Sequence, residues 1–252
     1  MLSYSCGGEG NDPAPPRRKG LQMDKRRHYL LGLDTETANG ILLPNGKVDL
    51  SQSLVYDIGW AICDTKGNIY KERSFVISDI YIGYRDLMRS CHYSAKLPKY
   101  EADLKAGTRT LASLHTVLKT FYEDIKEWNV KEVFAHNAYF DYRALTNTIR
   151  YITKSKKRHW FSKDLEIWDT MKMAQIIKKQ KAYTDFCDKY GYKTNHKVPQ
   201  NQVKAEVLYR YITGNNDFEE AHTGLEDVRI EVAILAHCYK QHKPMNKKLF
   251  SN

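Results

Sequence analysis

Cysteine is sparse in this sequence, and its distribution excludes a disulfide framework. The 252 residues contain five cysteines, an odd number, and no two of them have Cys-x-x-Cys spacing. Small secreted domains are instead stapled by dense, even-numbered sets of cysteines. We therefore expect a protein of a reducing, intracellular compartment and place it in the cytoplasm. The cysteines are Cys6, Cys63, Cys91, Cys187 and Cys238.

Long apolar runs are also missing. No stretch approaches the roughly 18 apolar residues that a membrane-spanning helix needs, and the N-terminus lacks the apolar core of a signal peptide. No repeat of solenoid-like period is present. With 42% hydrophobic residues, a chain of this length suffices for one sizeable core. We therefore expect one soluble domain without membrane contact.

Acidic residues are outnumbered by basic ones. The chain has 40 Lys and Arg against 30 Asp and Glu, which gives a formal net charge of +10. Clustered basic side chains bind polyanions because they release counterions from phosphate backbones. The charge therefore favours nucleic acid as a partner, although a basic surface that serves only solubility has the same charge.

Composition divides the chain into three parts. Residues 1–28 contain two consecutive glycines, three prolines and the basic run Arg17-Arg18-Lys19, without apolar periodicity. Such a composition is typical of a disordered leader. We expect the folded domain at residues 29–243 and a C-terminal tail at residues 244–252.

Apolar periodicity predicts an α/β fold. An antiparallel meander followed by alternating strands and helices implies a mixed, mostly five-stranded sheet flanked by helices, with the functional site at strand ends. Residues 78–110 show no clear pattern beyond short helices. Strands are predicted at residues 30–37, 53–63, 69–77, 130–135 and 165–168, the second and third joined as a hairpin. Helices are predicted at residues 111–128, 138–152, 170–180, 182–190, 202–213 and 223–241.

The most informative stretch is residues 30–37, an apolar strand that ends at two acids. Side chains alternate faces along a strand, so Asp34 and Glu36 would point into the same small volume. Two carboxylates so close repel each other unless a cation lies between them, and a divalent metal is the usual one. Asp-x-Glu alone is a common tripeptide, and a solvated turn is the competing interpretation.

A second acidic motif begins at His136, where a strand passes into a helix. Asn137 is a candidate N-cap, and Asp141 would lie in the first turns, near the positive end of the helix macrodipole. A carboxylate at this position often serves only to interact with the dipole, which is the competing interpretation.

The third motif opens the last long helix. Thr223 and Glu226 match a capping box, which places His222 before the cap and Asp227 at the fourth helical position. Those two positions ordinarily meet in a hydrophobic staple, so we expect this imidazole and this carboxylate side by side. A plain salt bridge between them is the competing interpretation.

Together the three motifs resemble the DEDDh group of 3'-5' exonucleases in the ribonuclease H-like superfamily. In chain order the motifs are Asp-x-Glu, Asn-x-x-Phe-Asp-x-x-x-Leu and His-x-x-x-x-Asp. This pattern is similar to that of polymerase proofreading subunits and of ribonuclease T. The resemblance runs from about Leu30 to Tyr239 and includes Asp57-Ile58-Gly59. In the sister group that carries tyrosine, that residue lies four before the last acid. Here that position is Thr223, so the histidine type matches better.

The resemblance implies a ribonuclease H-like exonuclease fold and two divalent metal ions, Mg²⁺ or Mn²⁺, held by oxygen ligands. Asp34 would bridge both ions, Glu36 and Asp227 would complete the side of the nucleophile, and Asp141 would support the second ion. His222 would be the general base. The candidate substrate contacts are Thr35, Thr37, Asn137 and Phe140, with plain packing as the alternative for Thr35 and Phe140.

The implied function is metal-dependent removal of mononucleotides from the 3' end of DNA, preferentially single-stranded. Trimming of RNA by the same site is the alternative, because nothing in the sequence reads a 2'-hydroxyl. An inactive nucleic-acid-binding module is less favoured, because clustered negative charge facing phosphate weakens binding. The expected partners are single-stranded DNA or RNA 3' ends, and a polymerase or another replication protein is a candidate protein partner.

Residues 154–163 interleave basic and aromatic side chains. Such a segment predicts either a grip on single-stranded nucleic acid, with bases stacked on the aromatics, or a solvated loop.

Overall fold

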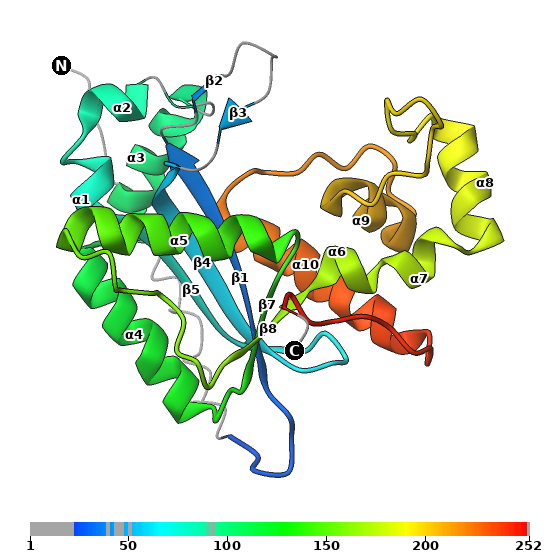
Figure 1. Ribbon diagram of the computed structural model, residues 1–252, viewed down its shortest axis with the longest axis horizontal. Coiled ribbons are helices and arrows are strands. Elements are labelled where there is room, and N and C mark those ends of the chain that lie inside the picture. Colours follow the sequence, from blue (N-terminus) through cyan, green and yellow to red (C-terminus); the bar gives the residue numbers. More distant parts are fainter. Residues whose placement is uncertain are drawn as a thin grey trace, which may run out of the picture.

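The structure, a computed structural model, describes residues 23–38, 41–42, 48–49, 52–89, 91 and 94–250. Most of the predicted leader, residues 1–22, lies outside this range. Residues 23–28 precede the first strand, and the Met23 side chain packs against the core. One mixed sheet runs through the molecule, with helices on both of its faces (Figure 1).

The central sheet has six strands in the order β6-β5-β4-β1-β7-β8. The pairs β1–β4 and β4–β5 are antiparallel, while β1–β7, β7–β8 and β5–β6 are parallel. These strands are β1 (Leu30–Ala38), β4 (Leu54–Cys63), β5 (Ile69–Ile77), β6 (Thr110–Ala112), β7 (Glu132–Ala135) and β8 (Glu166–Asp169). A separate two-stranded pair consists of β2 (Ile41–Leu42) and β3 (Val48–Asp49).

The predicted mixed sheet is confirmed, and β6 adds a strand to it. Five strands match the predicted runs within one or two residues, and the predicted hairpin joins β4 to β5. The three residues of β6 are too few to show an alternating pattern, which explains why the sequence did not reveal it.

Strands β1 and β4 lie at the centre of the sheet because both are apolar on both faces. All ten residues of β4 are buried, which matches the near-continuous apolar run expected for a strand covered on two sides. On β4, Trp60 and Ile62 belong to the larger core, whereas Ala61 and Cys63 belong to a second core on the other face.

The two cores lie under different helices. Helices α4 (Leu114–Glu127) and α5 (Ala138–Thr153) cover the first core, and α10 (Gly224–Lys240) covers the second (Figure 1). The remaining helices are α1 (Ser78–Tyr81), α2 (Arg85–Arg89), α3 (Leu97–Ala106), α6 (Thr170–Met173), α7 (Gln175–Lys178), α8 (Lys181–Tyr190) and α9 (Ala205–Thr213), with a 3-10 turn η1 at Ser94–Lys96. No helix within these described residues is long and apolar enough to cross a membrane.

The single helix predicted at residues 170–180 is instead two one-turn helices, α6 and α7. The Ile177 amide donates to the Ala174 carbonyl, a bond one residue shorter than in a regular α-helix. This tighter turn separates the helices and leaves both Met173 and Ile177 fully buried in the second core.

The basic and aromatic segment at residues 154–163 does not present its aromatics to solvent. Trp160 is fully buried, Phe161 is 9% exposed, and both belong to the core under α4 and α5. The Trp160 carbonyl also accepts a hydrogen bond from the Tyr122 hydroxyl. The interpretation of these two rings as a base-stacking platform is therefore wrong, because they fill the interior.

The C-terminal residues run along the outer edge of β8. The Asp169 amide donates to the Lys247 carbonyl at 2.8 Å, and the Leu249 amide donates to the Ile167 carbonyl at the same distance. Leu249 is 8% exposed and packs into the first core.

Candidate active site

The first two acids lie at the end of β1. Along this strand Leu31 and Leu33 face the core under α4 and α5, whereas Leu30 faces α10. Alternation of side chains therefore places Asp34 and Glu36 on the α10 side. The pairing register with β4 shifts immediately after Glu36, so regular pairing is interrupted where the acids are presented.

The start of α10 brings the third motif to the same place. The helix begins after Thr223, as predicted, with Asp227 as its fourth residue. The capping box itself is not formed, because the Glu226 carboxylate accepts from the Thr223 hydroxyl at 2.6 Å rather than from its amide. The Thr223 amide donates instead to Asp227 Oδ2 at 3.0 Å. Asp227 Oδ2 thus accepts a hydrogen bond at the start of the helix that carries it. Only Asp227 Oδ1 is left to bind other groups.

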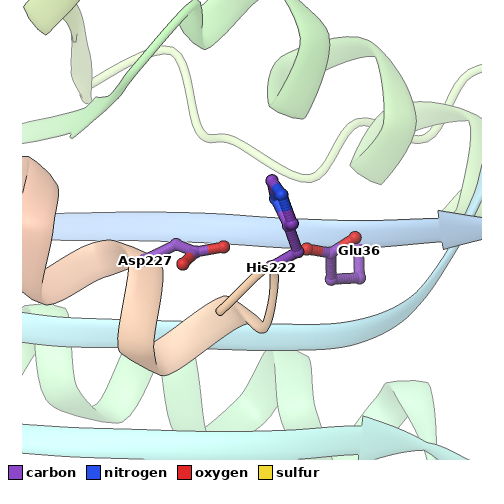
Figure 2. A group of neighbouring side chains, drawn as sticks. All are labelled: Glu36, His222 and Asp227. Carbon is purple, nitrogen blue, oxygen red and sulfur yellow. The ribbon is translucent and has the colours of Figure 1, made fainter. Parts of the chain in front are cut away.

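Glu36, His222 and Asp227 converge, although almost 200 residues of sequence separate the first from the other two. Their ligand atoms all lie within 4.8 Å of one another, close enough to share a metal ion (Figure 2). Side-chain Nδ1 of His222 also lies 3.8 Å from Glu220 Oε2. His222 has a φ of 49°, a left-handed conformation that is uncommon outside glycine and costs free energy.

Asp141 enters the site from the other face of the sheet. It lies in the first turn of α5, is 2% exposed, and accepts a hydrogen bond of 2.7 Å from the Thr35 hydroxyl. Asn137 precedes the helix in a left-handed conformation, but its side chain makes no capping hydrogen bond. The backbone amide of Asn137 donates to Asp169 Oδ1 instead. The prediction that the Asn137 side chain caps the helix is therefore wrong.

Burial and mutual repulsion raise the pKa values of these acids. Burial is the largest cause in each case, and it raises the pKa of Glu36 to about 9, of Asp227 to about 8 and of Asp141 to about 7. Burial and then the charge of Asp141 raise the pKa of Asp34 well above its usual range. The site therefore carries a strongly negative potential when ionised, which a divalent cation would relieve.

Three carboxylate oxygens in this cluster are buried and have no hydrogen-bond partner in the described part of the chain. They are Asp34 Oδ2, Asp227 Oδ1 and Glu231 Oε2. Unpaired buried oxygens are costly, whereas they are the ligands that Mg²⁺ and Mn²⁺ prefer. The donor set therefore fits hard divalent cations.

Glu231 was not identified from the sequence. It lies one helical turn after Asp227 on α10, is 2% exposed, and its Oε1 accepts from the His136 amide at 2.7 Å. The available signal was its position between Ile230 and Val232 in an apolar stretch. Acids are rarely buried in such a stretch unless they are paired or bind a metal.

A cation from the segment without a recognisable motif also reaches the site. Lys96 donates from its ammonium group to the Ala221 carbonyl, directly before His222. Its charge favours the ionised forms of Glu36 and Asp227 and thereby opposes the rise in their pKa values. Nothing in the local sequence around Lys96 indicated this role.

A cavity of about 580 Å³ opens beside Asp34, on the side of α8 and α9. Asp34 and Glu231 contribute acids to its wall, and Lys193 and Lys204 contribute cations. Its volume lies within the range of ligand pockets. Of the predicted substrate contacts, Asn137 lines this cavity, Thr35 is buried against Asp141, and Thr37 and Phe140 are partly exposed on β1 and α5.

The sequence matches no family model and no curated protein. Among solved structures, Escherichia coli exonuclease I in complex with a 5cy-dT13 oligonucleotide is similar, with 15% identity and a TM-score of 0.52 over 86% of this chain. A full-length 3'-exonuclease matches 93% of this chain and 68% of its own, with 12% identity and a TM-score of 0.51. The nuclease domain of 3'hExo, a DEDDh family member bound to rAMP, matches 90% of this chain with 13% identity and a TM-score of 0.48.

These likenesses define the fold. The chain has the α/β fold of the ribonuclease H-like 3'-5' exonucleases, as the sequence predicted. It spans 41% of the length of exonuclease I.

Proposed function

We propose that this protein is a metal-dependent 3'-5' exonuclease that removes mononucleotides from single-stranded DNA. The convergence of Glu36, His222 and Asp227 beside Asp34 carries the proposal. These residues come from opposite ends of the chain, and buried oxygens of Asp34 and Asp227 have no hydrogen-bond partner among the described residues, which favours a bound cation. The proposed catalytic unit comprises residues 29–243.

Asp34, Glu36, Asp141 and Asp227 would hold two divalent cations, Mg²⁺ or Mn²⁺. When bound, such a pair supplies charge neutralisation at the phosphate and makes a bound water more acidic. The unpaired oxygens of Asp34 and Asp227 support this assignment.

His222 is the proposed general base. Its side chain is 38% exposed, so water and substrate reach it, and it lies beside Glu36 and Asp227. In the proposed reaction a water oxygen bonds to phosphorus and its proton passes to His222. The bond between phosphorus and the 3' oxygen of the preceding nucleotide breaks, and a 5'-mononucleotide leaves.

The substrate assignment rests on the cavity beside Asp34 and on the net charge of +10. Lys193 and Lys204 on the cavity wall are suitable phosphate contacts. The likeness to exonuclease I in complex with a DNA oligonucleotide favours DNA, and RNA with the same chemistry is the alternative.

Digestion of 3'-labelled and 5'-labelled DNA and RNA oligonucleotides, with Mg²⁺ or with EDTA, tests the proposal. We expect labelled mononucleotide at once from the 3'-labelled DNA and a ladder of shortening products from the 5'-labelled DNA, both only with Mg²⁺. Faster cleavage of RNA would establish the alternative substrate. Binding without cleavage would contradict the proposed activity and support an inactive binding module.

A further inference from the structure

Helix α10 carries Asp227, and a buried ion cluster outside the acidic site holds the first turn of that helix. At its centre is Arg109, beside the start of β6, whose side chain is 2% exposed. Its main partner is Asp57 on β4, which is fully buried. We infer that Arg109, with its partners Asp57 and Glu226, forms a positioning cluster that sets the place of Asp227 and His222 relative to Glu36. The inference rests on the proposed function.

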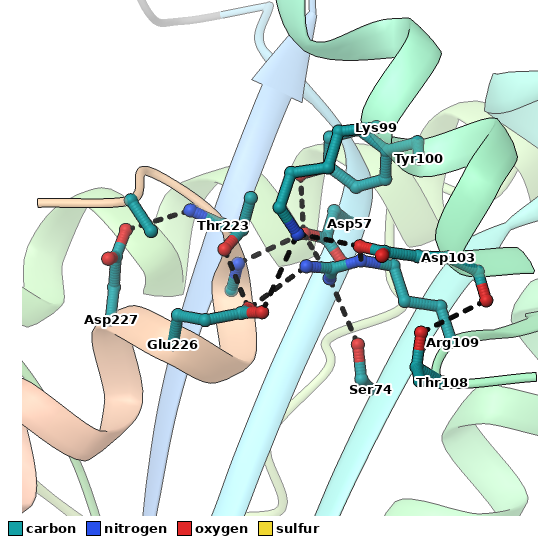
Figure 3. Close-up of polar contacts among 12 residues, drawn as sticks. Asp57, Ser74, Lys99, Tyr100, Asp103, Thr108, Arg109, Thr223, Glu226 and Asp227 are labelled. Atoms are coloured by element: carbon teal, nitrogen blue, oxygen red, sulfur yellow. Dashed lines mark hydrogen bonds and ion pairs between the residues drawn. The ribbon is translucent and has the colours of Figure 1, made fainter. Parts of the chain in front are cut away.

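The guanidinium of Arg109 contacts three carboxylates from three elements (Figure 3). Nη1 lies 3.2 Å from Asp57 Oδ2, Nη2 lies 2.9 Å from Glu226 Oε2, and Nε lies 3.0 Å from Asp103 Oδ2. A planar guanidinium with donors in a fixed fork can connect all three at once, which a lysine ammonium cannot do with the same geometry. Arg109 therefore fixes β4, α3 and α10 relative to one another.

Asp57 also binds α10 directly. Its Oδ2 accepts from the Gly224 amide at 2.9 Å, one of the amides at a helix start that have no partner within the helix. The same oxygen accepts from the Tyr100 hydroxyl at 2.6 Å. Asp57 pairs with Glu36 across β4 and β1. Asp57 thus lies opposite Glu36 in the sheet and also binds Gly224, the first residue of the helix that carries Asp227.

Glu226 transmits this arrangement to the residues beside the site. Its Oε2 accepts from Arg109 and also from the Thr223 hydroxyl at 2.6 Å, directly after His222. The cluster therefore controls where the helix starts and how it is rotated about its axis. Contacts that orient metal-binding side chains without touching the metal change metal affinity or activity by about 10- to 100-fold when they are removed.

A second anchor of α10 provides a matched control. Arg229 on α10 makes two hydrogen bonds with Glu72 on β5, at 2.6 and 3.0 Å. Glu72 is 31% exposed and Glu226 is 35% exposed, so the two glutamates are alike in type and exposure, and each pairs with an arginine. Only Glu226 lies in the first turn.

The experiment compares Glu226→Ala, Glu226→Gln and Glu72→Ala in the full chain. Glu226→Ala leaves Arg109 paired with Asp57 and Asp103, so the buried charge keeps its partners and the variant is expected to fold. We expect kcat with Mg²⁺ to fall by about 10- to 100-fold, with KM for the oligonucleotide changed less than twofold. Glu226→Gln keeps an oxygen that can accept from Arg109 and Thr223, so most of the rate should return. Glu72→Ala should keep the wild-type rate.

Hydrogen exchange of the metal-free protein supplies a measurement that needs no nuclease activity. Amides of residues 223–228 should exchange faster in Glu226→Ala than in Glu72→Ala or in wild type. Equal exchange in the two alanine variants together with an unchanged kcat would overturn the inference. If wild type cleaves no substrate, the proposed function fails, and exchange at residues 223–228 alone decides whether the cluster positions the helix.

Discussion

Gly59 on β4 and Gly224 at the first residue of α10 are in backbone contact, with no room for a side chain between them. A Cβ on Gly59 would lie 2.2 Å from the Leu225 nitrogen, and one on Gly224 would lie 2.6 Å from the Gly59 nitrogen. Such separations are far below van der Waals contact, and the atoms concerned belong to the backbone. This contact sets how closely the helix that carries Asp227 approaches the strand beside Asp34.

Gly59→Ala is expected to push the start of α10 away from the sheet. Overpacking of this kind costs about 1–3 kcal/mol, and kcat should fall further than the loss of folded protein explains. Urea unfolding together with kcat per folded molecule measures both effects. Gly107→Ala is the control, because a Cβ there meets nothing within 4 Å. With its φ of 74° it should lose about 1–2 kcal/mol but retain kcat.

Asp34→Asn is expected to abolish hydrolysis without unfolding the protein. The substitution removes a carboxylate with a buried Oδ2, and the ionised form of this carboxylate is repelled by its neighbours, so the melting temperature in EDTA should stay the same or rise. The rise in melting temperature that Mg²⁺ gives the wild type should be lost, because metal binding stabilises only the folded state. Turnover above a few per cent of wild type would contradict the assignment of Asp34.

Stability of the metal-free protein should fall as the pH rises from about 7 to about 8.5. The folded protein holds protons on Asp141, Asp227 and Glu36 up to pKa values of about 7, 8 and 9, whereas the unfolded chain loses them near pH 4. A group whose pKa is raised in the folded state contributes its full stabilisation at a pH below its pKa in the unfolded chain. That stabilisation is lost as the pH rises from there through its pKa in the folded state. Buried thiols such as Cys63 and Cys238 act in the same direction only at higher pH.

Melting temperatures in EDTA across this range measure the effect. Asp227→Asn should flatten the decline, because it removes one of the titrating groups. Mg²⁺ should stabilise the wild type more at the upper end of the range, since the metal then displaces fewer protons. A flat profile in EDTA would contradict the raised pKa values of the cluster.

His222→Ala is expected to lower kcat by on the order of 10² to 10⁴, with metal affinity mostly retained because the carboxylates remain. An ordinary imidazole titrates near about pH 6.5, and only its neutral form accepts a proton. At Mg²⁺ concentrations that saturate the carboxylates at every pH, the wild-type rate should therefore fall on the acidic side, and this limb should be absent from the variant. A variant that keeps the limb would assign the titration to another group.

Removal of residues 1–22 is expected to leave kcat and melting temperature unchanged. The prediction comes from the composition of that segment, which offers no apolar periodicity for packing. A lower melting temperature after truncation would show that the segment packs on the domain.

The parts of the site that the sequence predicts are those set by local periodicity. Strand alternation gives the shared face of Asp34 and Glu36, and the helix frame gives Asp227 its position one turn inside α10. Both follow from spacings of two to five residues. Cap chemistry was less predictable, because Thr223 and Asn137 had other donors and acceptors available once the chain folded.

The residues that were not predicted from the sequence contact partners that are far away along the chain. Arg109 meets Asp57 at a distance of 52 residues and Glu226 at 117 residues, and Lys96 meets Ala221 at 125 residues. No local pattern specifies such contacts. Residues 78–110 form short elements, and their role in the site follows only from their contacts with β4 and with the start of α10.

The C-terminal segment along β8 has a consequence for association between copies of the chain. An open strand edge offers unpaired amides and carbonyls to other molecules and promotes aggregation. Here Lys247 and Leu249 pair with that edge, while the opposite edge is the three-residue β6, too short to template another strand. A chain cut before Lys247 would expose the β8 edge, and it should self-associate at concentrations at which the longer chain stays dispersed.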